Sequence, residues 1–426
     1  MVKLSTKIPV FVFFMLIALQ ATAGRVEGLY NVEIAVAAES KASREQAFIA
    51  GLDKVFVRIS GDSIVMDKLK RPSASRYVKQ FSYEPIAEPE PQQDGILLTQ
   101  YLKIQYNGSA MEKYLLDNGF AAWGEHRPDL VVWLVVRDGK NEYVLKNNHR
   151  SLLKKVAVES LDDRGIPNRW PKFDSQDKKI LSVSDIRGGF KEPVIKASQR
   201  YSRGPALSGS LIWNGRRWTS SWSLLMEGGN RHWALDDKDY NSLISKAMDQ
   251  AADALGAVFA VHTVTDKSQL ATVSLDVLAV DNIDSYHFLE SYLLGLSAVE
   301  SVKPSLVDGK KAVIDVLLRS NEDDFLNLIK NDGQLTELSA PEIPLPSIAQ
   351  ITTAQKQSGD SSSTAGKAPP LLLPEGPSSE NASVNSAASN APETTETAGV
   401  EQGNGTLLAA RASQTSTYYY RLNPPQ

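Results

Sequence analysis

Tryptophans are concentrated in one short stretch of this 426-residue chain, which holds four of its seven tryptophans. Trp218 and Trp222 are four residues apart, so on a strand their rings point to the same side. Trp213 precedes a turn signal and is placed to lie across from them. Such an aromatic face binds a glycan, a peptide or a partner protein, or it packs as core beneath helices. These three residues are therefore candidate binding residues, with core packing as the favoured alternative.

A second candidate is the segment Arg187-Gly188-Gly189, which precedes a helix predicted from Phe190. Backbone amides at the start of a helix hold anions, and Arg187 would add positive charge. A tight turn that leads into the helix also explains the two glycines, and we favour this simpler interpretation.

The remaining polar residues show no assembled catalytic or metal-binding motif. The chain has no cysteine, and none of its five histidines lies three or four residues from another. It contains no phosphate-binding loop, no dinucleotide-binding glycine pattern and no nucleophile elbow. Adjacent acids such as Asp162-Asp163 point apart on a helix or strand, so their pairing in sequence is no sign of acid–base catalysis. We therefore predict no catalytic residue, no metal and no cofactor.

The first 23 residues resemble a secretory signal peptide. Lys3 and Lys7 precede an apolar run over residues 8–19, and Ala21-Thr22-Ala23 offers a cleavage site. The run is shorter than the ~20 residues of a membrane span, and an uncleaved anchor is the alternative. Removing two lysines leaves 44 of the 46 basic residues beside 50 acidic ones. We expect a mature periplasmic chain without a membrane span, and its acidity argues against nucleic-acid binding.

Residues 24–125 are predicted to form a first α/β module. Residues 32–36 alternate as a strand does, and Ser40 is a plausible cap for a helix over residues 42–57. The same patterns predict a helix over 67–81, a strand over 97–106 and a short helix over 110–118.

Residues 126–264 are predicted to form a central α/β module. Leu130–Val136 is a continuous apolar run, typical of a strand buried on both faces. Asn214-Gly215 is a hairpin signal that joins predicted strands at 206–213 and 218–226. A further strand at 231–235 and helices at 151–161, 190–201 and 240–261 complete this module.

Residues 270–340 show the clearest pattern, the βαββαβ order of ferredoxin-like folds. Strands are predicted at 272–280, 299–306, 311–318 and 335–338, with helices at 285–294 and 322–330. Residues 341–412 are rich in Ser, Ala and Thr and are expected to be a disordered linker. Residues 413–426 contain the β-prone TYYYRL, for which we prefer a strand on a sheet edge over a disordered end. The fold class is therefore mixed α/β (α+β), with three small modules.

Several motifs carry a resemblance to a known family. They are GLYNVEIAVAAES, VFVRISGDS and YVKQFSYE in the first module, followed by DIRGGF, ALSGSLIWNGRRWTSSWSLLMEGG and AADALGAVFA in the central module. Together they resemble the bacterial family catalogued as a domain of unknown function, number 2066, over roughly residues 25–338. This chain departs from it by the long insertion before residue 413. The resemblance implies an exported envelope protein and no known activity, so no catalytic residue is carried over.

Three functions agree with these observations. The leading hypothesis is a non-enzymatic factor that binds or scaffolds an envelope protein in the periplasm or at a membrane. The first alternative is a hydrolase of envelope polymers, in which distant carboxylates converge in the fold. The second is a small-ligand or glycan binder that uses the tryptophan-rich face.

Overall fold

The computed structural model describes residues 25–87, 89, 97–263, 270–339 and 415–423. All of these belong to one compact unit. The predicted signal peptide and the predicted disordered linker lie outside the described residues. Three β-sheets with flanking helices confirm the mixed α/β class. No helix among the described residues combines the length and the apolar character that crossing a membrane requires.

The first module is a three-stranded antiparallel sheet under a long helix. Its strands lie in the order β1 (Asn31–Val36), β3 (Gln100–Tyr106), β2 (Val78–Pro85). Helix α1 (Lys41–Ser60) begins at Ser40, whose side chain accepts a hydrogen bond from the Ser43 amide, as the sequence predicts. Its buried face packs on the sheet in one hydrophobic cluster, and α3 (Gly108–Asp117) follows β3 directly.

The helix predicted over residues 67–81 is wrong. The chain instead forms the four-residue α2 (Val65–Lys68), a single 3-10 turn at Ala74–Arg76, and then strand β2. Pro72 lacks an amide donor and disfavours helix in the residue before it, so α2 ends early. Pairing with β3 then places Phe81 beside Ile104 and Tyr83 beside Leu102, a tertiary gain that local helix propensity does not register.

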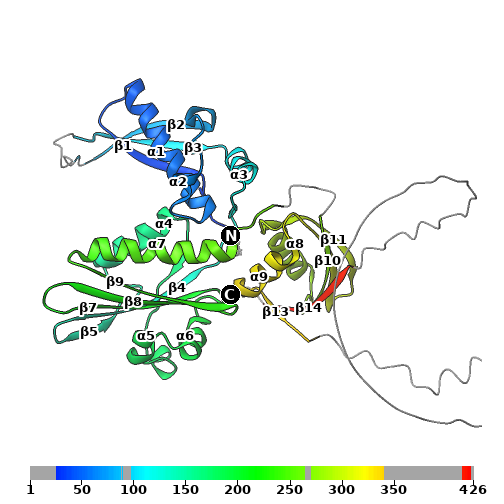
Figure 1. The fold of residues 1–426 in the computed structure, drawn as a ribbon. Helices are drawn as coiled ribbons and strands as arrows, with labels where there is room; N and C mark the ends of the chain where they lie inside the picture. The colour runs from blue at the N-terminus through cyan, green and yellow to red at the C-terminus, as the bar shows by residue number, and fades with distance from the viewer. Residues whose placement is uncertain (1–24, 88, 90–96, 264–269, 340–414, 424–426) are drawn as a thin grey trace, which may run out of the picture. The chain divides into compact units, whose positions relative to one another are not determined.

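The central module is a sheet with helices on both faces. The strands lie in the order β5 (Asn141–Val144), β4 (Leu130–Asp138), β7 (Ala206–Trp213), β8 (Trp218–Met226), β9 (Gly229–Asp237), and β6 (Asn168–Arg169) also pairs with β4. Helices α4 (Leu152–Asp163) and α7 (Tyr240–Phe259) cover one face, and α5 (Val183–Gly188) and α6 (Lys191–Ser198) cover the other (Figure 1).

Strand β4 explains the apolar run of the central module. Side chains along β4 alternate between the two faces of the sheet. Val132 and Leu134 belong to the hydrophobic cluster under α4 and α7, while Val131 and Trp133 belong to the cluster under α5 and α6. Each of these side chains is fully buried. The strand runs parallel to β7, and its burial on both faces is confirmed.

The third module has the βαββαβ order that the sequence predicts. Its elements are β10 (Thr272–Leu278), α8 (Ile283–Gly295), β11 (Val299–Val307), β12 (Lys311–Leu318), α9 (Glu322–Asp332) and β13 (Leu335–Glu337). The C-terminal residues form β14 (Ser416–Leu422), and the sheet order is β11-β12-β10-β14-β13. Strand β14 therefore lies between β10 and β13, and not at the sheet edge where we expected it. Its interior place follows from Tyr420 and Leu422, which are both buried in the core.

A buried arginine holds the segment between the first two modules. Arg127 is fully buried, and its guanidinium stacks on Trp123, 4.2 Å from the ring centroid. It donates only to backbone carbonyls, those of Arg58, Trp123, Gly124, Arg164 and Gly165. Arg58 lies in the last turn of α1, and Arg164 caps α4, so the cation also meets the negative ends of two helices.

Candidate binding cleft

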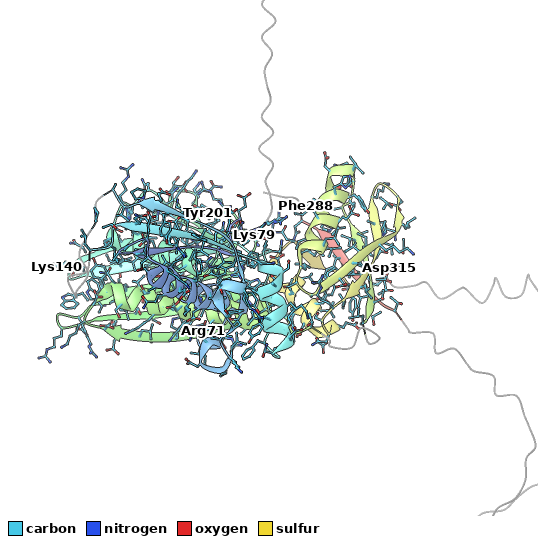
Figure 2. All side chains as sticks on the ribbon, turned by 90° about the horizontal axis from the view of Figure 1, so that it is seen from above. Arg71, Lys79, Lys140, Tyr201, Phe288 and Asp315 are labelled. Carbon is cyan, nitrogen blue, oxygen red and sulfur yellow. The ribbon has the colours of Figure 1, made fainter. Side chains whose placement is uncertain are left out.

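One candidate site is a cleft of about 1280 Å³, above the ~300–1,000 Å³ of most ligand pockets. Its lining includes Tyr30 and Glu112 of the first module and helix α8 of the third. Figure 2 labels two lining side chains, Lys79 from β2 and Phe288 from α8. We refer to this feature as the cleft.

Tyr30 and Glu112 form the central polar contact of the cleft. The Tyr30 hydroxyl donates to Oε1 of Glu112 over 2.5 Å. Glu112 stands on α3, whose start is fixed by Asn107, because the Asn107 side chain accepts from the Ala110 amide. Residue 108 must be glycine, because a Cβ at this position would lie 2.5 Å from the ring of Tyr30. The local sequence therefore sets both the helix that carries Glu112 and the space that Tyr30 fills.

The environment of Glu112 favours its neutral form. Burial, more than any other cause, raises the pKa of Glu112, and the nearby Glu125 raises it further. The hydrogen bond from Tyr30 and the charges of Arg319 and Arg127 oppose the change. Burial and the neighbouring Glu112 carboxyl also hold the pKa of Tyr30 well above its usual range. Among the described residues, Glu112 forms no ion pair. A half-buried carboxyl whose pKa is raised by burial marks the cleft as a candidate site.

Helix α8 supplies an apolar wall. Phe288 is half-buried, and Leu294 exposes 53% of its surface to solvent. Leu116 of α3 also lines the cleft. Exposed apolar side chains grouped along a cleft that also holds polar groups are typical of sites that recognise another molecule.

A second buried polar group lies beside this wall. Tyr292 is 3% exposed and lines the cleft, and its hydroxyl lies beside the carboxyl of Asp332. Burial and the neighbouring Asp332 raise the pKa of Tyr292 well above its usual value. Asp332 lies 3.1 Å from Nε2 of His126, and the His126 ring packs edge-on against Tyr292. His126 thus joins the segment after the first module to α9.

Two arginines of the cleft are paired with carboxylates. Arg25 lies 2.6 Å from a carboxylate oxygen of Glu125, and Arg319 lies 3.2 Å from Glu300. Glu125 keeps a 31% exposed side chain, so the cleft does not hold two deeply buried carboxylates. Within the described part of the chain, no three His, Asp or Glu side chains are grouped as a metal site would need. The arrangement is suited to hydrogen bonding, ion pairing and apolar contact.

The candidate tryptophans lie elsewhere, on the face of the central sheet that α7 covers. Trp213 and Trp218 are cross-strand partners with ring centroids 5.3 Å apart, and both are half-buried. Trp222 is 1% exposed in the core, over Gly209, where a Cβ would lie 2.3 Å from its ring. The rings therefore share one face, and Trp222 is a core residue. None of the three lines the cleft.

Arg187, Gly188 and Gly189 end helix α5 and form the turn that leads into α6, as the favoured interpretation expected. Gly188 is the last residue of α5, and Gly189 caps it with a φ of 62°. The Gly189 amide donates to the Ile186 carbonyl, so it is already used within the helix end. Gly189 also touches Ser223, since a Cβ there would lie 2.2 Å from its hydroxyl oxygen.

Arg187 is engaged as well. Its guanidinium lies 2.8 Å from a carboxylate oxygen of Glu142 on β5. The structure therefore accounts for this segment by helix capping and close packing, and it brings these residues neither to the tryptophans nor to the cleft.

Sequence reasoning did not find Tyr30, Glu112 or Tyr292. Tyr30 precedes β1 and Glu112 stands on a short helix, while Tyr292 belongs to a different module far along the chain. No spacing rule connects them, because they meet only in the folded chain. The one available signal is helix α8, whose apolar residues exceed what a single buried face needs.

The comparisons with known proteins concern the first module. Residues 23–124 match a family model described as Domain of unknown function (DUF8605). The match includes Tyr30 and Glu112 but not the wall that α8 supplies. No curated protein matches the chain, and no solved structure does.

Proposed function

We propose that this chain is an exported protein of the bacterial cell envelope that binds a partner protein through the cleft and does not act as an enzyme. The observation that carries the proposal is the cleft itself, which combines the half-buried Tyr30–Glu112 contact with the exposed apolar side chains of α8. Recognition sites combine apolar area with a few oriented polar groups in this way.

Export and family are part of the same proposal. The charged start, the short apolar run and Ala21-Thr22-Ala23 support a cleaved signal peptide and a periplasmic mature chain. The family model that matches residues 23–124 carries the number 8605, so the relationship to the family numbered 2066 rests on the motifs alone. These motifs continue past residue 124 into the central module, and we propose that relationship over roughly residues 25–338. Fractionation of cells and N-terminal sequencing of the mature chain would test export directly.

Site-specific photocrosslinking tests the binding proposal. Ser109 and Ser291 are exposed residues of the cleft, and a benzoylphenylalanine at either position would face a bound partner. The same probe at Lys140, in the turn after β4, is the control. We expect both cleft positions to give one adduct of the same mass in intact cells, and Phe288→Asp to abolish it. Adducts that are equal at all three positions, or absent at all three, would contradict the proposal.

A hydrolase of envelope polymers is the second candidate, and one observation favours it. Burial raises the pKa of Glu112, as general acids require. This function predicts that the mature chain releases soluble fragments from purified envelope polymer, and that Glu112→Gln stops the release while Asp117→Asn on the same helix does not.

A further inference from the structure

Strand β9 (Gly229–Asp237) forms an open edge of the central sheet. It lies last in the strand order, and no described residue other than those of β8 pairs with it. Its nine residues pair with β8 in unbroken register, and they include neither proline nor lysine. An edge of this kind presents a row of unpaired N–H and C=O groups, which another strand can bind.

The other edge strands of the described chain carry features that prevent such pairing. Strand β11 contains Pro304 and two breaks in its register, and β2 has one break and ends at Pro85. Strands β5, β6 and β13 have only four, two and three residues, and β1 has six. Short length, proline and bulges are the usual means by which proteins block edge-to-edge pairing. Strand β9 is therefore the longest regular edge that the structure describes.

The register of the hairpin shows which groups of β9 face outward. Met226 and Gly229 are paired across a two-residue turn, so they form a hydrogen-bonded pair. In an antiparallel ladder such pairs alternate with pairs that make no hydrogen bond to each other. The backbone N–H and C=O groups that point away from β8 are therefore those of Asn230, His232, Ala234 and Asp236.

The charges of β9 divide the strand into a basic and an acidic half. Arg231 and His232 lie near its start, and Asp236 and Asp237 lie at its end. Arg231 is exposed and forms no ion pair with another described residue. A strand of this pattern is complementary to itself when a copy runs in the opposite direction. These charges therefore favour a second copy of this chain as the strand that the edge receives.

We propose that the β9 edges of two copies pair antiparallel about a two-fold axis at Ala234, so that the central sheet continues through a dimer. Residues at equal distances from the axis then face each other, with their side chains on the same side of the sheet. Arg231 faces Asp237 of the second copy, and His232 faces Asp236. No residue of β9 lines the cleft, so this inference does not depend on the binding function proposed above.

The residues at the centre of this edge fit such a pairing. Trp233 faces Leu235 of the second copy, and both are half-buried, so pairing covers further apolar area. Ala234 is exposed, and its small side chain lets the two strands approach at the axis.

The acidic half already has cations of its own chain. Asp236 forms an ion pair with Arg217, and Asp237 lies 2.9 Å from the Lys246 ammonium. The pairs across the axis therefore act mainly on register, because any shift of the two strands brings like charges closer together. The backbone hydrogen bonds of the two edges supply most of the affinity.

Sedimentation of the full mature chain tests the dimer. We expect a dimer, and we expect Arg231→Glu to raise its dissociation constant at least about tenfold, because two attractive pairs become repulsive. Lys140→Glu is the control, since it makes the same change of charge in the turn between β4 and β5, at the other side of the sheet. It should leave the dissociation constant unchanged, and circular dichroism should show both variants folded.

A single engineered thiol tests the register. The chain has no cysteine, so Ala234→Cys carries one thiol per copy. Residues of a hydrogen-bonded pair have Cα atoms about 5.5 Å apart, which a disulfide can join. Asn230→Cys, at another exposed position of β9, is the control. Its two copies would lie eight residues apart along the paired strands, about 27 Å.

We expect the Ala234→Cys chain to form a disulfide-linked dimer at least about ten times faster than the Asn230→Cys chain under mild oxidation, because only the former holds its thiols in contact. Three outcomes would overturn the inference. They are an unaltered chain that sediments as a monomer at every concentration, equal rates of dimer formation for the two thiols, or an Ala234→Cys chain that becomes linked in cells to a different protein. The last result would make β9 the edge for a strand of another partner.

Discussion

Gly61 and Gly256 meet in backbone contact, and a Cβ built on Gly256 would lie 2.3 Å from the carbonyl oxygen of Gly61. Gly61 caps α1 in the left-handed conformation, and Gly256 lies in the last turns of α7. Next to them Trp123 stacks on Phe259 at 5.6 Å. This contact joins the first module to the central one, and it requires glycine on both sides.

Gly256→Ala should therefore destabilise the protein although alanine is the better helix former. Helix propensity favours the change by about 1 kcal/mol, but the new methyl overlaps backbone atoms of Gly61 that cannot move without shifting α1. We expect the free energy of unfolding to fall by about 1–3 kcal/mol in urea denaturation. Gln250→Ala, at an exposed position of the same helix, is the control and should stay within about 0.5 kcal/mol. A stabilised Gly256→Ala would show that the two backbones are not in contact.

The tryptophan-rich face gives a graded prediction. Trp222→Ala removes a ring that is 1% exposed and should cost about 3–5 kcal/mol of unfolding free energy. Trp213→Ala removes a half-buried ring at the end of a strand and should cost less. Thermal and chemical unfolding of both variants measure the difference. If Trp222→Ala folds with unchanged stability and loses binding of a glycan or peptide, the ring is a ligand contact instead of core.

The raised pKa of Glu112 predicts how stability varies with pH. The pKa of Glu112 is higher in the folded chain than in the unfolded chain, so at a pH between these two values the folded chain binds more protons. The free energy of unfolding therefore falls as the pH rises through that range. Glu112→Gln cannot ionise and still accepts from Tyr30. It should therefore lose less stability than the unaltered chain between about pH 4.5 and neutral pH. Urea denaturation of both at several pH values provides the comparison, and parallel curves would contradict it.

The interior place of β14 predicts that the last residues stabilise the third module. Leu422 is 3% exposed and pairs with Leu335 of β13, so Leu422→Ala should cost about 2–5 kcal/mol. Arg421→Ser, at the exposed neighbouring position, is the control and should be nearly neutral. Hydrogen exchange should accelerate at β13 and β10, which β14 joins. Unchanged exchange at β13 in Leu422→Ala would contradict this role.

Periodicity predicted most of the elements because burial patterns are local. The strands β7, β8 and β12 have the bounds that the apolar alternation and the hairpin signals give. The helix expected over residues 67–81 failed, because there the pairing of Phe81 and Tyr83 with β3 outweighs a weak helical pattern that Pro72 interrupts. The favoured turn at Gly188 and Gly189 does lead into a helix, α6, while the short helix α5 that these glycines end was not predicted.

By itself the sequence determined the α/β class, the βαββαβ order of the third module and the strand character of the last residues. Each of these depends on side-chain periods that neighbouring residues set. Only the tertiary structure decided that β14 enters between β10 and β13, that Trp222 is core, and that Tyr30, Glu112 and Tyr292 line one cleft. The physical reason is that these relationships join residues far apart in the chain, whose meeting is fixed by packing of whole elements and leaves no local pattern.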